Sequence, residues 1–271
     1  MLKILITNDD GIFAPGVAMM AEVLQHFGEV YVVCPERERS AISHSITLRN
    51  PLKLTKVDFA SNVSAWAVNG TPADCIKLGM EVLLKERPDI VFSGINIGPN
   101  VGRDIHYSGT MAGASEALLY GVPAVAVSLA ATAGQKADLP EIKTLFYEVA
   151  EVILRNSIPK DVFLNVNLPY LSKEMCKGVR VIGPDLSVSR YNFVGLNDPY
   201  GQVYYWLKDG YEQLENLKES SDFKLLKDGY VTISPIEMKL TQKRRLDQVS
   251  RWFTNFDRKA YETAGFSAVK E

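Results

Sequence analysis

The segment Met1-Leu2-Lys3-Ile4-Leu5-Ile6-Thr7-Asn8-Asp9-Asp10-Gly11 decides the fold of this chain. An apolar run of strand length and strand composition, residues 2–7, ends in two adjacent carboxylates and a glycine. In an open α/β sheet, ligands bind outside the carboxyl ends of the strands, so the acidic pair lies where a site is expected. Asp9 and Asp10 would repel each other, and a hard divalent cation such as Mg²⁺ or Mn²⁺ would remove that penalty. Asn-Asp-Asp-Gly is also strong turn chemistry, so this segment alone leaves a metal site and a solvated turn as alternatives.

Apolar runs alternate with amphipathic stretches through the first two-thirds of the chain. The pattern predicts strands at 2–7, 29–34, 89–93, 124–129 and 161–167, helices at 15–26, 71–85, 110–120 and 140–156, and antiparallel or edge strands at 52–57 and 64–68. Such alternation is typical of an α/β fold with a mostly parallel sheet covered by helices on both faces.

The sequence changes in character from about Gly178. Short β-branched and aromatic runs at 179–182, 202–207 and 230–234 are separated by turn residues, as in hairpins, and 241–253 is helical in pattern. We therefore expect two parts. Residues 1–177 would form the catalytic core, and residues 178–271 a smaller C-terminal β-hairpin and helix region.

The bulk properties limit the classes of partner. The 271 residues are 46% hydrophobic and carry a formal net charge of -2, which offers no whole-protein field to attract nucleic acid or an anionic membrane. The three cysteines show no zinc-type spacing and suit a reducing compartment. The acidic pair interrupts the first apolar run before a signal peptide could form, and no apolar stretch approaches a membrane span. A cytoplasmic protein with no nucleic-acid or membrane partner is expected.

Two loops after predicted strands carry further oxygen donors. In the segment 39–45, Ser40 can act as a weak oxygen ligand and Arg39 as a phosphate clamp, although a solvated, hydroxyl-rich loop explains the same residues. In the segment 93–100, Asn96 offers a hard amide oxygen between glycines that let the backbone approach a ligand. Turn chemistry is again the alternative.

The segment Tyr107-Ser108-Gly109-Thr110 leads directly into a predicted helix. Free backbone N–H groups and small hydroxyl residues at a helix start make an anion cradle, and a simple N-cap by Ser108 or Thr110 is the alternative. Together, the segments place hard oxygen ligands and an anion seat at one edge of one sheet. That combination indicates metal-assisted phosphoryl chemistry.

Several motifs of other enzyme classes are absent from the sequence. No Gly-x-Gly-x-x-Gly follows the first strand, and there is no Walker-type loop, no Gly-x-Ser-x-Gly elbow and no two-histidine metal signature. Of the histidines, we expect a structural role for His26. His44 and His106 lie in the candidate loops as acid–base groups or as plain surface or capping residues.

Five linked motifs occur in a fixed order along the chain. They are Asn8-Asp9-Asp10-Gly11 with Ala14-Pro15-Gly16, Arg39-Ser40 with Ser43, Gly70-Thr71-Pro72-Ala73-Asp74-Cys75, Ser93-Gly94-Ile95-Asn96 with Gly98-Pro99-Asn100, and Tyr107-Ser108-Gly109-Thr110. With these motifs the chain resembles the SurE survival protein family of 5′-nucleotidases, from Met1 to about Trp252.

This resemblance implies a metal-dependent phosphatase that acts on nucleoside 5′-monophosphates, with 3′-nucleotides and short-chain polyphosphate accepted by some relatives. It places one divalent cation per subunit, Mg²⁺ or Mn²⁺, on Asp9, Asp10, Ser40 and Asn96. It also implies a Rossmann-like, three-layer core and a C-terminal region exchanged between the subunits of a homodimer or homotetramer.

A mechanism follows as a hypothesis. Asp9 would orient or deprotonate the attacking water, and Ser108, Gly109 and Thr110 would hold the phosphate oxygens. The acid that protonates the leaving group stays unassigned, with His106 as a weak candidate.

Two other classes also begin with acidic residues after a first strand. A haloacid-dehalogenase-like phosphatase would use an aspartate as nucleophile, but it favours Asp-x-Asp spacing, and here the two are adjacent. A non-enzymatic, receiver-like domain would need an Asp ending its central strand and a Lys ending a later one. The segments 92–94 and 127–129 carry neither.

Overall fold

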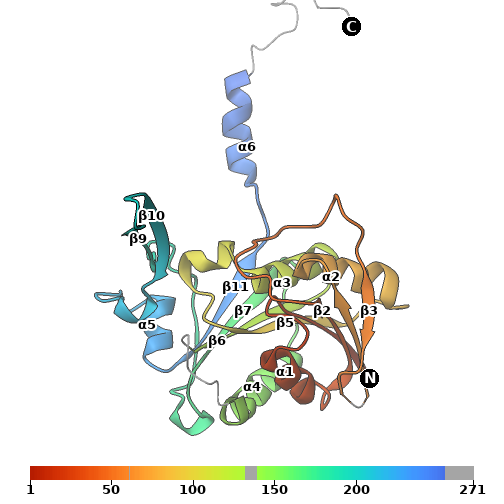
Figure 1. The fold of residues 1–271 in the computed structure, drawn as a ribbon. Helices are drawn as coiled ribbons and strands as arrows, with labels where there is room; N and C mark the ends of the chain where they lie inside the picture. The colour runs from red at the N-terminus through yellow and green to blue at the C-terminus, as the bar shows by residue number, and fades with distance from the viewer. Residues whose placement is uncertain (61, 132–138, 254–271) are drawn as a thin grey trace, which may run out of the picture. The chain divides into compact units, whose positions relative to one another are not determined.

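The computed structural model describes residues 1–60, 62–131 and 139–253. Nine strands within these ranges form one twisted sheet (Figure 1). Its order is β3 (Leu54–Val57), β4 (Val63–Val68), β2 (Gly28–Pro35), β1 (Leu2–Thr7), β5 (Ile90–Ile97), β6 (Ala124–Ala130), β7 (Val162–Pro169), β11 (Val231–Glu237) and β8 (Val179–Val181). The predicted α/β, Rossmann-like class is confirmed.

The chain reverses its direction of travel across the sheet beside β1. It adds β2 and β4 in parallel on one side of β1, then returns to add β5, β6 and β7 in parallel on the other side. The carboxyl ends of β1 and β5 therefore flank the point where the strand order reverses. In open α/β sheets this point is where ligands bind.

Helices cover both faces of the sheet, as the alternating pattern predicts. Helices α1 (Pro15–Leu24) and α4 (Leu139–Leu154) pack together on one face, and α2 (Pro72–Leu78) and α3 (Gly109–Leu119) on the other (Figure 1). Side chains from the strands and from α1 and α4 fill the first of these interfaces, where the rings of Phe92 and Phe146 meet edge to face at 6.4 Å.

The start of α2 follows the sequence prediction. The Thr71 side chain accepts a hydrogen bond from the Asp74 N–H, and the Asp74 carboxylate accepts one from the Thr71 N–H. This reciprocal capping box, with Pro72 in the first turn, fixes the helix start. The helix ends earlier than expected, because a π-helical turn at Gly79–Leu83 follows it.

Strand β5 is longer than the sequence predicts. Residues 94–97, expected in a loop, belong to the strand, with an irregular register between Ser93 and Asn96. Gly94 makes this irregularity possible, since its φ is +137° and a Cβ there would lie 2.2 Å from the Val127 carbonyl oxygen. The correction matters for function, because it places Asn96 at the end of a strand within the sheet.

The segments after residue 178 divide between two sheets. The run at 202–207 forms a hairpin as predicted, with β9 (Tyr191–Asn197) antiparallel to β10 (Val203–Asp209). The runs at 179–182 and 230–234 do not form hairpins, because β8 and β11 extend the main sheet instead. The polar segment expected as a loop at 212–223 contains part of helix α5 (Asp222–Lys227).

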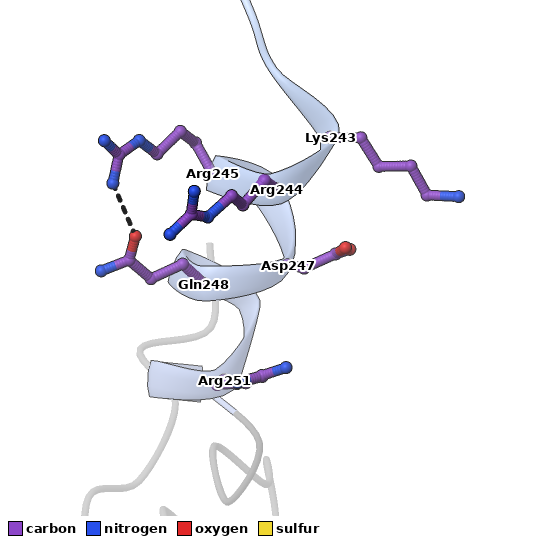
Figure 2. Close-up of a pocket in the computed structure, with 6 residues that line it drawn as sticks. All are labelled: Lys243, Arg244, Arg245, Asp247, Gln248 and Arg251. Carbon is purple, nitrogen blue, oxygen red and sulfur yellow. Dashed lines mark hydrogen bonds between the residues drawn. The ribbon is translucent and has the colours of Figure 1, made fainter.

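The chain divides into two compact units, Met1–Glu237 and Met238–Glu271. The domain boundary expected after residue 177 stays a prediction. In the second unit, α6 (Lys243–Ser250) confirms the predicted helix, and its Arg245 side chain points to Gln248 and donates a 3.0 Å hydrogen bond to it (Figure 2). The tail after Asp257, expected to fray, lies outside the described residues. None of the described helices is long and apolar enough to cross a membrane.

Candidate active site

The four predicted site segments meet at the reversal of strand order. Asp9 and Asp10 follow β1, and Asn96 lies at the end of β5, which pairs in parallel with β1. The loop after β2 joins them, because the Arg39 N–H donates a 2.7 Å hydrogen bond to the Asp9 carbonyl oxygen. The start of α3 completes the group through Thr110.

Asp9 is buried, and the start of α3 holds its carboxylate in place. The Thr110 hydroxyl donates a 2.6 Å hydrogen bond to Asp9 Oδ1. Burial raises the pKa of Asp9, while the Thr110 hydroxyl and the backbone N–H groups of Thr110 and Gly109 lower it. The N-terminal end of α3 therefore already binds an anion, the carboxylate of Asp9.

The close approach of Asp9 to α3 requires a glycine at position 109. A Cβ on Gly109 would lie 2.7 Å from Asp9 Cβ and 2.9 Å from Asp9 Oδ2. Because these distances are shorter than van der Waals contact, any other residue would displace the carboxylate or the helix. This glycine thus has a steric role that its turn-like sequence context does not reveal.

Asp10 carries the features of a cation ligand. Burial and the charge of Asp9 raise the pKa of Asp10 to about 7, against a hydrogen bond from the Ile97 N–H that lowers it. Among the described residues, Asp10 Oδ2 is buried and has no hydrogen-bond partner. A buried oxygen with no donor beside a second carboxylate is costly, and a bound cation would satisfy it.

Asn96 and Ser40 are the neutral oxygen donors predicted for the site. The Asn96 Nδ2 donates a 2.6 Å hydrogen bond to the Gly98 carbonyl, which leaves the side-chain oxygen available to a ligand. Ser40 is exposed, and its hydroxyl donates a 2.5 Å hydrogen bond to Glu38. In the described residues, no three His, Cys, Asp or Glu side chains gather around a metal position. A cation here would need neutral donors in addition to the two carboxylates, and the set fits Mg²⁺ or Mn²⁺.

Ser108 acts as the N-cap of α3, the alternative that the sequence left open. Its hydroxyl oxygen accepts a 3.2 Å hydrogen bond from the Met111 N–H, so the hydroxyl proton stays available to a ligand. Arg39, the other candidate for phosphate, donates from Nη2 to the Asn69 carbonyl at 2.7 Å. This contact holds the loop, while Arg39 Nε is buried with no hydrogen-bond partner among the described residues.

The histidines separate into different roles. His26 packs edge to face on Tyr147, with ring centroids 5.9 Å apart, in line with the structural role expected for it. His106 is exposed on the 3₁₀ helix Gly102–His106, just before α3. The His44 Nε2 lies 2.7 Å from Glu116 on α3, so it links the Ser40 loop to that helix.

Sequence reasoning missed Glu116 and a buried asparagine cluster. The signal for Glu116 was a single acidic residue in the middle of an otherwise small and apolar helix sequence. The cluster holds the turn after β5, since Asn165 and Asn167 both donate to the Asn100 carbonyl and the Asn100 Nδ2 donates to Ser128. Asparagines spaced by two in a buried strand were the available signal, because both point to the same face of the sheet.

Comparison with known proteins identifies the family of this chain. The family model described as "Survival protein SurE" matches residues 4–188. The 5′-nucleotidase SurE of Thermoanaerobacter sp. (strain X514) is 44% identical over 253 residues, covering 93% of this chain and 98% of that protein. The 5′-nucleotidase SurE of Geobacter metallireducens is 41% identical over 251 residues, covering 93% of this chain and 97% of that protein.

A solved structure agrees with the fold over the same length. The crystal structure of the SurE protein from Aquifex aeolicus superposes with a TM-score of 0.80 at 35% identity, covering 92% of this chain and 99% of that one. The residues matched by the family model include the acidic pair, the end of β5 and the start of α3. The chain belongs to the SurE survival protein family.

Proposed function

We propose that this protein is a divalent-metal-dependent 5′-nucleotidase, which hydrolyses nucleoside monophosphates to nucleoside and phosphate. The observation that carries the proposal is the pair of carboxylates at the reversal of strand order. Asp9 is fixed by α3, and Asp10 has a buried oxygen that no described donor satisfies. The relatives named 5′-nucleotidase SurE supply the substrate class.

The residues divide the work of binding and hydrolysis. Asp9, Asp10, Ser40 and Asn96 would hold one Mg²⁺ or Mn²⁺ per subunit. When bound, such a cation neutralises phosphate charge and lowers the pKa of a water molecule. Asp9 Oδ1 accepts from Thr110, which fixes the plane of this carboxylate for orienting or deprotonating the attacking water.

The start of α3 would bind the phosphate. Ser108 has a hydroxyl proton free to donate, and the N–H groups of Gly109 and Thr110 already face an anion in Asp9. A phosphate oxygen would share these donors with Asp9, and the positive end of the helix dipole would favour both. The leaving-group acid stays unassigned, and exposed His106 is its candidate.

Wider activity and assembly belong to the same proposal. Activity toward 3′-nucleotides and short-chain polyphosphate, a cytoplasmic location, and a homodimer or homotetramer are all proposed. The hairpin of β9 and β10 supports self-association, since Phe193 is 72% exposed and Trp206 69%.

Phosphate release tests the proposal directly. A panel of 5′- and 3′-mononucleotides would be incubated with Mn²⁺, with Mg²⁺ and with EDTA, beside Asp9→Ala and the matched control Asp161→Ala. Asp161 is an exposed carboxylate before β7, at the opposite edge of the sheet. We expect metal-dependent release that is lost in EDTA and in Asp9→Ala and kept in Asp161→Ala. Equal activity of the two variants would contradict the site.

A further inference from the structure

A hollow of about 450 Å³ opens at the carboxyl ends of β5 and β6. Residues 97–99 and Ala131, at the ends of β5 and β6, form one wall. Arg190, Asp209 and residues 211–213, which flank the hairpin of β9 and β10, form the opposite wall. Its volume lies within the usual range for a small-molecule site.

The hollow shares a wall with the proposed metal site. The Ile97 N–H donates to Asp10, and the Gly98 carbonyl accepts the 2.6 Å hydrogen bond from Asn96. Two lining residues are thus bonded to two proposed metal ligands. A substrate with its phosphate at Asp9 and Asp10 would direct its leaving group into this hollow.

The charges of the hollow are unsuited to a second phosphate. Arg190 Nε lies 2.9 Å from Asp104 Oδ2, and Arg190 Nη2 donates a 2.8 Å hydrogen bond to the Tyr191 hydroxyl. The guanidinium is therefore already neutralised by a buried carboxylate. Asp209 also contacts Arg190, with Oδ1 3.5 Å from Nε, and it accepts a hydrogen bond from the Tyr211 N–H. Glu212 adds a further carboxylate to the lining, which can only accept hydrogen bonds when ionised.

The wall at the ends of β5 and β6 suits a flat ring. Ile97, Pro99 and Ala131 are apolar, and Tyr211 belongs to the wall across from them. An apolar wall combined with a rim of acceptors fits a ligand that has a planar body and outward N–H or O–H donors. A nucleoside has this chemistry, with its ribose hydroxyls and, in adenine, cytosine and guanine, an exocyclic amino group.

We propose that this hollow binds the nucleoside half of the substrate and that Glu212 selects bases that carry an amino group. The inference rests on the proposed 5′-nucleotidase function. A base with a carbonyl oxygen at the same position would face a carboxylate, two acceptors with no proton between them. The hollow thereby favours AMP over IMP, which differ at that group.

Steady-state kinetics with three substrates tests this assignment. The substrates would be AMP, IMP and ribose 5-phosphate, which lacks a base. We expect kcat/KM for AMP to exceed that for IMP by about tenfold in the wild type and the ratio to approach one in Glu212→Gln. In Gln213→Ala, the AMP to ribose 5-phosphate ratio should fall by about tenfold, since the variant removes a contact to the nucleoside.

Glu215→Gln is the matched control, because Glu215 is an exposed carboxylate of the same segment outside the hollow. It should keep the wild-type ratios. Unchanged ratios in both Glu212→Gln and Gln213→Ala would overturn the proposal, as would a wild type that treats AMP and IMP alike.

Calorimetric titration with adenosine separates this inference from the proposed function. In one outcome, no substrate releases phosphate, yet adenosine binds the wild type and binds Gln213→Ala at least about tenfold more weakly. The proposed nucleotidase function would then be wrong, and the nucleoside site in the hollow would be supported. In the other outcome, phosphate is released but adenosine binds the wild type and Gln213→Ala equally. The nucleoside site in the hollow would then be wrong, and the nucleotidase function would be supported.

Discussion

The His44 imidazole lies 2.7 Å from the Glu116 carboxylate, and this contact fastens the Ser40 loop to the helix that holds Asp9. The loop needs such a fastening. Ala41 and Ser43 both have φ of +53°, a left-handed conformation that costs energy in residues other than glycine. Besides His44, the Ser43 N–H donates a 2.9 Å hydrogen bond to the Tyr107 carbonyl.

Removing this contact should weaken metal binding. We expect His44→Ala to lower the Mn²⁺ affinity by about tenfold, since partners that orient metal ligands have effects of this size. Isothermal titration with Mn²⁺ measures it. Lys77→Ala is the control, because Lys77 contacts the other oxygen of the Glu116 carboxylate at 3.3 Å and its removal leaves the His44 contact in place. Equal affinity in the wild type and His44→Ala would show that the loop holds its position without the contact.

A single methyl group at position 109 should damage the site. In Gly109→Ala the new Cβ would meet Asp9 at 2.7 Å, and a displacement of about 1 Å can lower kcat about 100-fold. Gly183→Ala is the matched control, since a Cβ there would meet open space among the described residues. Phosphate release compares the two. Normal turnover in Gly109→Ala would mean that the placement of Asp9 against α3 is not needed.

Metal should stabilise the folded protein through Asp10. At a Mn²⁺ concentration about 100 times Kd, the free energy of unfolding should rise by about 2.7 kcal/mol in the wild type. Asp10→Asn should lose most of this gain, and Ser40→Ala should keep most of it, because water can replace a hydroxyl ligand. Thermal unfolding with Mn²⁺ and with EDTA measures the gain. A full gain in Asp10→Asn would place the cation elsewhere.

Asp104 should contribute to the pH dependence of stability. Burial raises its pKa to about 6, despite the opposing charge of Arg190. The folded state therefore binds a proton more tightly than the unfolded state. The resulting stabilisation is fully present below about pH 4 and is lost as the pH rises through 6, by about 2–3 kcal/mol.

Urea unfolding in EDTA between pH 4 and 8 tests this sign. Asp104→Asn is neutral at every pH, so its stability should fall less steeply than that of the wild type between pH 4 and 7. An unchanged slope would assign the pH dependence to other carboxylates.

Local sequence patterns predicted the parallel core well. Each successful prediction rested on residues that act within a few positions of the chain, so the element they form can be read from the sequence. They are the apolar run before Asp9, the capping residues Thr71 and Pro72, and the small residues around Gly109. The outcome at Ser108 followed the same logic, since an N-cap was one of its two alternatives.

Long-range pairings were not predictable in this way. β11 pairs with β7 across more than sixty positions, and its sequence suits a hairpin equally well. The contact of His44 with Glu116 spans 72 positions, and no pattern in the sequence around either residue indicates the pairing. Asn96 was expected in a loop because Gly94 suggests a turn, whereas the structure uses that glycine to bring β5 against Val127.

The hold of α3 on Asp9 also has a consequence for synthesis. Asp9 and Asp10 leave the ribosome among the first residues. Thr110, whose hydroxyl donates a hydrogen bond to Asp9, follows 101 positions after Asp9. Until then Asp9 lacks the Thr110 hydroxyl and the backbone N–H groups that offset the cost of its burial in the folded protein. A nascent chain that stops before α3 would carry every acidic ligand and still have no active centre.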